Sequence, residues 1–263
     1  MNVFLIYKKE HAKINNTFIN YLIDEAKLLD INLELKYYED LDKKILPDAI
    51  INRTNDYTLA KYYEDLNVRV FNNSYLSKIA NDKNLAYKLM IKNDIRILDI
   101  YEETDNIDSF PVVCKNPFGR GGNEVYLVNS KQEVEKLKQN FPSLTIQKFL
   151  KNSSKDLRVY VINNKIVASL LRKGHNDFRA NYSISKDATI YNLTSVQKEY
   201  VYKIINLFKI DYAGVDFLVD ENETLYFNEI EDSVGARALY TITDINIAKL
   251  YINHIYNQLK NRD

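Results

Sequence analysis

Two runs of alternating residues near the C-terminal end of the chain are separated by a short polar stretch. Residues 213–219 read AGVDFLV, residues 220–223 read DENE, and residues 224–231 read TLYFNEIE. Such runs on either side of a turn predict a β-hairpin. Because successive side chains of a strand point to opposite faces, the pattern also determines which residues share a face. This feature constrains the fold most, since it commits the late part of the chain to an antiparallel pair.

Three carboxylates lie on this expected hairpin. Glu229 and Glu231 are two residues apart and point the same way, and the hairpin partner can bring Asp216 beside them. Carboxylates this close repel one another unless a cation lies between them. Ligands that offer only oxygen suit Mg²⁺ or Mn²⁺, and Mg²⁺ usually accompanies phosphate. The alternative is an acidic strand end that is merely exposed to solvent.

Composition excludes several classes of protein. The 263 residues include 36 Lys and Arg and 36 Asp and Glu, so the net charge of +0 gives no overall attraction to nucleic acid or an anionic membrane. A single cysteine, Cys114, excludes an internal disulfide framework and a cysteine-based zinc site. The apolar run at 3–7 is too short for a signal peptide, and no run approaches the ~20 residues that cross a bilayer. We therefore expect a cytoplasmic protein without nucleic-acid or membrane partners.

The first part of the chain alternates between strand and helix patterns. We expect strands at 3–7, 33–37, 47–52 and 68–71, and helices at 16–29 and 58–66. Strands that alternate with helices predict a small parallel α/β domain, which we assign to residues 1–76.

The rest of the chain is richer in consecutive strands. Between residues 77 and 150 we expect a helix at 77–93, strands at 111–115, 124–128 and 145–150, and a helix at 132–139 with Ser130 as its N-cap. Between residues 151 and 263 we expect strands at 157–162 and 165–172, the hairpin, and helices at 195–208 and 245–259. The predicted fold class is α/β, with an α+β arrangement in the C-terminal part.

A glycine-rich segment joins two of these strands. The chain has only 6 glycines, and Gly119, Gly121 and Gly122 fall within four residues. Glycine lets backbone N–H groups approach phosphate oxygens closely, and Lys115 on the preceding strand adds a cation. Because the segment lies between two strands and opens no helix, it is neither a Walker loop nor a Rossmann fingerprint. The alternative is an ordinary hairpin turn.

The order of these features resembles the ATP-grasp superfamily and, within it, the RimK-like carboxylate–amine ligases. The resemblance covers the whole chain and depends on seven short motifs in sequence, which are NDK at 81–83, VCK at 113–115 with the glycines, IQKFL at 146–150, DLRV at 156–159, DFRAN at 177–181, GVD at 214–216 and EIE at 229–231. It implies an ATP-grasp fold with a lid-bearing subdomain at 77–150 and an antiparallel subdomain at 151–263.

The resemblance implies roles for individual residues. Lys83 and Lys115 match the lysines that hold the phosphates of ATP, and residues 119–122 match the lid over them. Gln147, Lys148, Phe149 and Leu150 match the hinge whose backbone contacts adenine, and Asp156 matches a polar position near the ribose. Asp216, Glu229 and Glu231 match a two-Mg²⁺ site, although relatives usually have Asn at the position of Glu231.

Six further polar residues are candidates for the reaction and its substrates. We expect Arg158 and Arg172 to neutralise the transferred phosphate and the developing oxyanion; the alternative is a pair of exposed strand charges. Arg179 and Asn181 are candidates for binding a carboxylate substrate, because arginine binds carboxylates in bidentate fashion. Arg53 and Arg237 are weaker candidates for the same role.

The resemblance implies an enzyme that uses ATP and Mg²⁺, or Mn²⁺, to join a carboxylate to an amine through an acyl phosphate. Its partners are then ATP and small-molecule or peptide substrates, and many relatives assemble as homo-oligomers. Two alternatives stay open, a nucleotide-binding protein without ligase activity and a kinase that stops after phosphoryl transfer.

Overall fold

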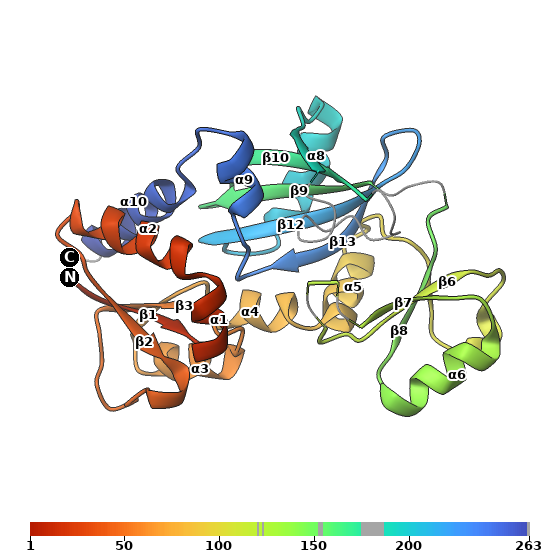
Figure 1. The fold of residues 1–263 in the computed structure, drawn as a ribbon, viewed down its shortest axis with the longest axis horizontal. Helices are drawn as coiled ribbons and strands as arrows, with labels where there is room; N and C mark the ends of the chain where they lie inside the picture. Colours follow the sequence, from red (N-terminus) through yellow and green to blue (C-terminus); the bar gives the residue numbers. More distant parts are fainter. Residues whose placement is uncertain (120, 123, 152–154, 175–186, 262–263) are drawn as a thin grey trace.

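The computed structural model describes residues 1–119, 121–122, 124–151, 155–174 and 187–261. These residues form three β-sheets that follow one another along the longest axis of the molecule (Figure 1). None of the helices in these ranges combines the length and the apolar character needed to span a bilayer.

The first sheet is parallel, as the sequence predicts. Its strand order is β2-β1-β3-β4, and every neighbouring pair runs in the same direction. The elements are β1 (Asn2–Tyr7), α1 (Lys9–Ile14), α2 (Asn16–Lys27), β2 (Asn32–Tyr37), η1 (Tyr38–Asp40), β3 (Ala49–Asn52), α3 (Tyr57–Asp65) and β4 (Arg69–Phe71). The four central residues of β1 are fully or almost fully buried, because helices cover a parallel sheet on both faces. The short helix α1 was not predicted.

The helix predicted at 77–93 is wrong, because two helices occupy this stretch. They are α4 (Ser74–Ala80) and α5 (Lys83–Lys92). Asp82 interrupts the expected single helix, because its side chain accepts hydrogen bonds from the backbone N–H groups of Asn84 and Leu85 and so caps α5. Lys83 therefore lies at the first position of α5 and not inside a long helix.

The second sheet is antiparallel and has the strand order β5-β8-β6-β7. Its elements are β5 (Ile100–Tyr101), η2 (Thr104–Asn106), β6 (Val112–Lys115), β7 (Val125–Val128), α6 (Lys131–Asn140) and β8 (Thr145–Lys148). The glycine-rich segment joins β6 to β7, as predicted. The Ser130 side chain caps α6 through the N–H of Glu133, also as predicted. Cys114 is fully buried in the small core under α6.

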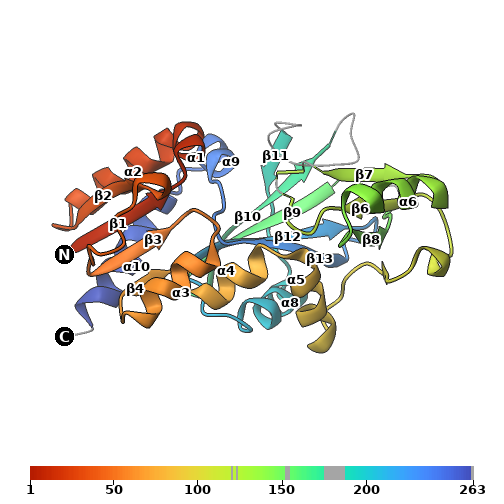
Figure 2. The ribbon, with the colours of Figure 1, turned by 90° about the horizontal axis from the view of Figure 1, so that it is seen from below.

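The third sheet has the order β11-β10-β9-β12-β13 and is antiparallel throughout. Its elements are β9 (Lys155–Ile162), β10 (Lys165–Lys173), β11 (Asp187–Ile190), α8 (Ser195–Ile205), β12 (Tyr212–Val219) and β13 (Leu225–Glu231). Figure 2 shows α5 and α8 on the same side of this sheet, and their apolar residues share one core with β9, β12 and β13. The strands β12 and β13 are the predicted hairpin.

The end of the chain returns to the beginning. Helix α9 (Arg237–Ile242) follows the hairpin, and α10 (Ile247–Lys260) then packs against α2, so residues of both ends fill one core. The predicted last helix is confirmed, but nothing in its own sequence pattern indicates that it covers the N-terminal sheet.

Candidate functional site

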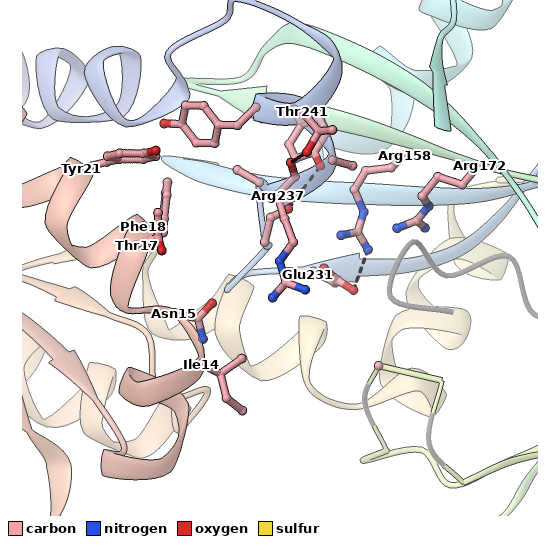
Figure 3. A pocket seen from close by; sticks show the side chains of 16 residues that line it. Ile14, Asn15, Thr17, Phe18, Tyr21, Arg158, Arg172, Glu231, Arg237 and Thr241 are labelled. Atoms are coloured by element: carbon pink, nitrogen blue, oxygen red, sulfur yellow. Dashed lines mark hydrogen bonds and ion pairs between the residues drawn. The ribbon is translucent and has the colours of Figure 1, made fainter. Parts of the chain in front are cut away.

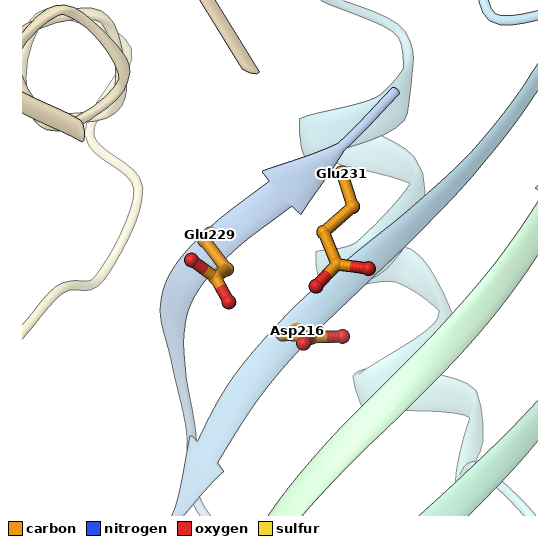
Figure 4. A group of neighbouring side chains, drawn as sticks. All are labelled: Asp216, Glu229 and Glu231. Atoms are coloured by element: carbon orange, nitrogen blue, oxygen red, sulfur yellow. The ribbon is translucent and has the colours of Figure 1, made fainter. Parts of the chain in front are cut away.

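The three predicted carboxylates converge in the structure. Asp216 on β12 pairs directly with Glu229 on β13, and Glu231 lies two residues further along the same strand. Each of the three offers a ligand oxygen within 4.8 Å of the others (Figure 4). Asp216 is only 1% exposed, so the alternative of a fully solvated acidic strand end is wrong for this residue.

Two arginines on the neighbouring strands hold this cluster. Arg158 on β9 donates to Asp216 from Nε at 2.8 Å and from Nη2 at 2.6 Å, and its Nη2 also lies 2.7 Å from Oε1 of Glu231. Arg172 on β10 donates from Nη2 to Asp216 at 2.9 Å. Both arginines are buried, which rules out the alternative of exposed strand charges. The charges of the arginines compensate carboxylates that would otherwise repel one another in a poorly hydrated place.

Asp156 belongs to the same network. Both of its carboxylate oxygens accept hydrogen bonds from Arg172, each at 2.5 Å, and the residue is buried. Burial raises the pKa of Asp156 to about 6, although the charge of Arg172 opposes this shift. Asp156 therefore anchors Arg172, and its predicted place beside a ribose stays a prediction.

The carboxylates of the cluster differ in their affinity for protons. Burial tends to raise the pKa of Asp216, but Arg158 and Arg172 outweigh burial and lower this pKa to about 2. Burial raises the pKa of Glu231 to about 7 against the attraction of Arg158, and the negative charge of Asp216 adds to the rise. Asp216 is thus firmly ionised, whereas the charge on Glu231 is easily neutralised.

The donor set of this cluster fits a hard divalent cation. All three side chains offer carboxylate oxygen, which is the ligand type that Mg²⁺ and Mn²⁺ prefer. A cation there also relieves the repulsion by Asp216 that adds to the effect of burial on the pKa of Glu231.

The two predicted phosphate lysines approach the cluster from the second sheet and from α5. Lys115 at the end of β6 is buried, and its Nζ donates to Gln147 Oε1 at 2.7 Å, Asn228 Oδ1 at 2.8 Å and Tyr87 Oη at 3.2 Å. Burial lowers the pKa of Lys115 to about 8, although Glu229 favours its charged form. A buried ammonium whose partners are all neutral groups is a strong site for an anion.

Lys83 connects the cluster to the glycine-rich segment. Its Nζ donates to the carbonyl oxygen of Gly119 at 2.5 Å and lies 3.4 Å from Oε2 of Glu229. Gly121 and Gly122 have φ of 61° and 76°, in the left-handed region that favours glycine. Through Lys83 the structure thus brings Gly119 next to Glu229, which is 110 residues away in the sequence.

The four predicted hinge residues lie at the end of β8. Gln147 is buried under Lys115, and its Nε2 has no hydrogen-bond partner in the part of the chain that is described. The Lys148 backbone N–H donates to Asp99 O at 2.9 Å, and its side chain forms an exposed ion pair with Asp99. Phe149 and Leu150 are half-buried just beyond the strand.

The predicted substrate residues separate into three groups. Arg237 lines a cavity beside the carboxylate cluster. Arg53 is buried instead between two sheets, where it donates to Tyr7 Oη at 3.1 Å and to the carbonyl oxygen of Val234 at 2.8 Å. This geometry makes Arg53 a packing residue between β3 and the segment after β13. Arg179 and Asn181 lie outside the described residues.

The cavity beside the cluster has a volume of about 490 Å³ (Figure 3). Arg158, Arg172 and Glu231 form one side of it, and the rest comes from α1, α2 and α9 together with Tyr160 of β9, Gly121 and the segment between β13 and α9. Gly121 and Glu231 also line a smaller neighbouring cavity of about 150 Å³, together with Lys83 and Glu229. The carboxylate cluster therefore lies between a space lined by Lys83 and a space lined by arginines.

Sequence analysis missed two residues of this site. Asn228 is the extra residue of a β-bulge, since Asp216 pairs with Glu229 while the next residue, Phe217, pairs with Phe227. The bulge directs the Asn228 amide oxygen to Lys115. Tyr87 was also missed, although its position one turn after Lys83 is a helical spacing that places both on one face of α5.

Sequence comparisons agree with this arrangement. A family model described as a RimK-like ATP-grasp domain matches residues 80–255. The uncharacterized protein MG011 of Mycoplasma genitalium is 30% identical over 263 residues, covering 96% of this chain and 91% of that protein. A probable alpha-L-glutamate ligase of Histophilus somni is 27% identical over 281 residues, covering 96% of this chain and 94% of that protein.

Solved structures share the fold. D-cycloserine synthetase DcsG superimposes with a TM-score of 0.79 at 11% identity, covering 98% of this chain and 100% of that one. D-alanine–D-alanine ligase from Bacillus anthracis does so with a TM-score of 0.76 at 20% identity, covering 100% of both chains. At these identities the likeness establishes the ATP-grasp fold alone. Together with the match of the family model over residues 80–255, it shows that this chain belongs to the RimK-like ATP-grasp family.

Proposed function

We propose that the protein is an ATP- and Mg²⁺-dependent ligase that joins a carboxylic acid to an amine and releases ADP and phosphate. The observation that carries this proposal is the position of the three carboxylates. Glu229 lies 3.4 Å from Lys83 on one side, and Glu231 lies 2.7 Å from Arg158 on the side of the large cavity. A phosphate donor and a carboxylate acceptor that occupied these two spaces would meet at the cluster.

The lysine side suits the polyphosphate of a nucleotide. Lys115 has an ammonium whose pKa burial lowers, and an incoming phosphate supplies the negative charge that restores its stability. Lys83 is held near the glycine-rich segment, whose backbone has the left-handed conformation at Gly121 and Gly122. Backbone N–H groups in such a segment bind phosphate oxygens without steric hindrance.

Asp216, Glu229 and Glu231 would hold the divalent cation. When bound, Mg²⁺ neutralises phosphate charge and orients the group that is transferred. The side chains of this chain do the remaining work of binding, orienting and charge compensation.

The arginine side suits a carboxylate that becomes an electrophile. In the first proposed step, a carboxylate oxygen attacks the γ-phosphorus of ATP, which forms an acyl phosphate and releases ADP. In the second step, the amine attacks the acyl carbon, the C–O bond to phosphate breaks, and phosphate and a proton leave. Arg158 and Arg172 lie where negative charge would develop in both steps, which is the role that fixed cations have in such reactions.

The names of relatives agree with this class of reaction. Several curated relatives are called probable alpha-L-glutamate ligases, and a structural neighbour is a D-alanine–D-alanine ligase. From these names we extend only the reaction class to this chain. We further propose that the nucleotide binds between the sheets of residues 77–150 and 151–263 and that the acid binds in the large cavity.

Hydroxylamine tests the proposal without knowledge of the natural amine. It intercepts an acyl phosphate as a hydroxamate, which ferric ion detects, while a coupled assay measures ADP. We expect ADP and hydroxamate in equal amounts when ATP, Mg²⁺ and a panel of carboxylic acids are present, and neither in a Glu229→Gln variant.

Two outcomes contradict the proposal. A stable phosphoester in place of hydroxamate identifies a kinase. ATP binding without ADP release from any acid in the panel identifies a nucleotide-binding protein that has lost the reaction. Thermal stabilisation by ATP does not distinguish these cases, because all of them bind the nucleotide.

A further inference from the structure

The large cavity has two chemically different sides (Figure 3). The side next to the carboxylate cluster is charged and consists of Arg158, Arg172 and Glu231. The other side is formed mainly by aromatic rings from three elements, which are Phe18 and Tyr21 of α2, Tyr160 of β9 and Tyr240 of α9. A ligand that fills this space therefore meets charge at one end and apolar surface at the other.

The aromatic side is a fixed surface. The rings of Tyr21 and Tyr240 lie with their centroids 5.0 Å apart at an angle of 59°. The Tyr240 hydroxyl accepts from the backbone N–H of Ala248 at 3.0 Å and lies 3.3 Å from Asn246 Oδ1, so this ring is anchored from behind. Tyr21 is 43% exposed although its ring lines the cavity. Covering such a ring with an apolar group releases water and favours binding.

Among the described residues, the charged side has one guanidinium without a hydrogen-bond or ion-pair partner. Arg158 and Arg172 already contact Asp216, and the acidic lining residue Glu231 contacts Arg158. Arg237 at the start of α9 points into the same cavity, and across the described ranges no hydrogen bond or ion pair engages its guanidinium (Figure 3). A free guanidinium beside apolar surface binds a carboxylate well and repels an ammonium.

We infer that this cavity binds a carboxylic acid with an aromatic or bulky apolar body, with Arg237 holding its carboxylate and Tyr21 and Tyr240 packing against the body. The identification of this acid as a substrate rests on the proposed ligase function. Arg237 is then a substrate-binding residue, and Tyr21 determines which acids are accepted. Small acids and acids that carry a second charge in place of the ring bind weakly, because they leave the aromatic side exposed to water.

The absence of tryptophan from the sequence allows a direct binding test. Indole-3-propionate contains only a carboxylate and an aromatic body, and its fluorescence is excited where the protein contributes little. We expect its anisotropy to rise to saturation as the wild-type protein is added. Three competitors separate the two required groups. We expect 3-phenylpropanoate to displace the probe, and we expect glutarate and 3-phenylpropylamine to be at least about tenfold weaker.

Variants identify the residues responsible. We expect Tyr21→Ala and Arg237→Gln each to weaken probe binding about tenfold, which corresponds to ~1.4 kcal/mol, and Arg237→Lys to recover part of the loss. Tyr202→Ala is the matched control, since Tyr202 on α8 is 38% exposed but does not line the cavity. This variant retains wild-type affinity if the ring at Tyr21 acts through the cavity.

The outcomes separate this inference from the proposed function. No saturable binding to the wild type, or equal affinity of Tyr21→Ala and Tyr202→Ala, overturns the inference. Hydroxamate formation from glutarate but not from 3-phenylpropanoate also overturns it while supporting a ligase. Specific binding of the probe without turnover of any acid supports the inference and removes the ligase proposal.

Discussion

Neutralising Asp216 is expected to destabilise the protein far more than neutralising Glu229, although both belong to one cluster. The Asp216 carboxylate is buried and accepts three hydrogen bonds from Arg158 and Arg172, between 2.6 and 2.9 Å. In Asp216→Asn the side chain has one acceptor oxygen, and its NH₂ group faces a guanidinium. Each of the two buried cations then loses one of its two carboxylate partners, and only Asp156 remains for Arg172 and Glu231 for Arg158.

The size of this effect follows from the structure in two ways. Removing one member of a buried ion pair costs about 3–5 kcal/mol, because the partner is left buried and uncompensated. The pKa of Asp216 is lowered from 3.8 to about 2, and at about 1.4 kcal/mol per pKa unit this shift corresponds to roughly 2 kcal/mol. We therefore expect Asp216→Asn to lose about 2–5 kcal/mol of unfolding free energy.

Glu229→Gln is the matched control. Glu229 is partly exposed, and its ion pair with Lys83 is 3.4 Å long. This pair is longer and more accessible to solvent than the pairs of Asp216, and we expect it to contribute about 1 kcal/mol or less. The assay is urea unfolding followed by circular dichroism at pH 7, with EDTA present so that no cation contributes.

The pH dependence provides a second check. A carboxylate whose pKa is lowered in the folded state contributes stability above its unfolded pKa, and the contribution is lost as pH falls through the folded pKa. The difference between wild type and Asp216→Asn should shrink as the pH falls below 4 towards the folded pKa of Asp216. If Asp216→Asn is as stable as Glu229→Gln, the ion-pair network described here does not support the fold. If the expected loss is found, inactivity of Asp216→Asn does not report on metal binding, and Glu229→Gln is the better probe of catalysis.

Three further predictions concern other buried groups. Lys115 has a pKa lowered from 10.5 to about 8, so the unfolded chain keeps the proton of this lysine to a higher pH than the folded protein does. The unfolding free energy of the wild type without ligands should therefore rise by up to ~3 kcal/mol between pH 8 and 10.5 relative to Lys115→Met. Parallel pH profiles of the two proteins in urea unfolding would contradict this. Gly214→Ala places a Cβ 2.6 Å from Val234 Cγ2 and should lower the free energy of unfolding by about 1–3 kcal/mol. The added Cβ of Gly235→Ala has no atom within 4 Å, so this variant should lose little stability. Equal melting temperatures of the two variants would contradict the steric effect at Gly214. Cys114 is fully buried, and burial raises its pKa to about 12. Ellman's reagent should therefore label no thiol in the folded protein at pH 8 and one per chain in urea, and rapid labelling without urea would contradict this burial.

Several elements could be predicted because their signals are local. The parallel order of the first sheet follows from strands that alternate with helices, and the hairpin at Asp216 follows from alternation on both sides of a polar turn. A helix boundary is harder to predict where a capping side chain interrupts a continuous apolar pattern. The apolar pattern of residues 77–93 continues across Asp82, but the Asp82 side chain competes for the backbone N–H groups and starts a new helix there.

Other features depend on contacts between distant residues. Arg53 follows a parallel strand, where ligands commonly bind, yet the carbonyl of Val234, 181 residues away, turns it into a packing residue. The aromatic side of the cavity combines α2 near the start of the chain with α9 near its end. The sequence pattern of neither helix indicates that it packs near the other.

Strand alternation within the sequence is enough to predict that Glu229 and Glu231 share a face of a hairpin that also carries Asp216. The pairing of Asp216 with Glu229 depends on the bulge at Asn228, which shifts the register by one residue and was not predicted. The pairing of Arg158 and Arg172 with Asp216 depends on the sheet, because the order β10-β9-β12 brings together residues 58 and 44 positions apart in the sequence. Side-chain periodicity operates within one element, whereas the partner of a buried charge is set by the packing of several elements, and that packing minimises the free energy of the whole chain.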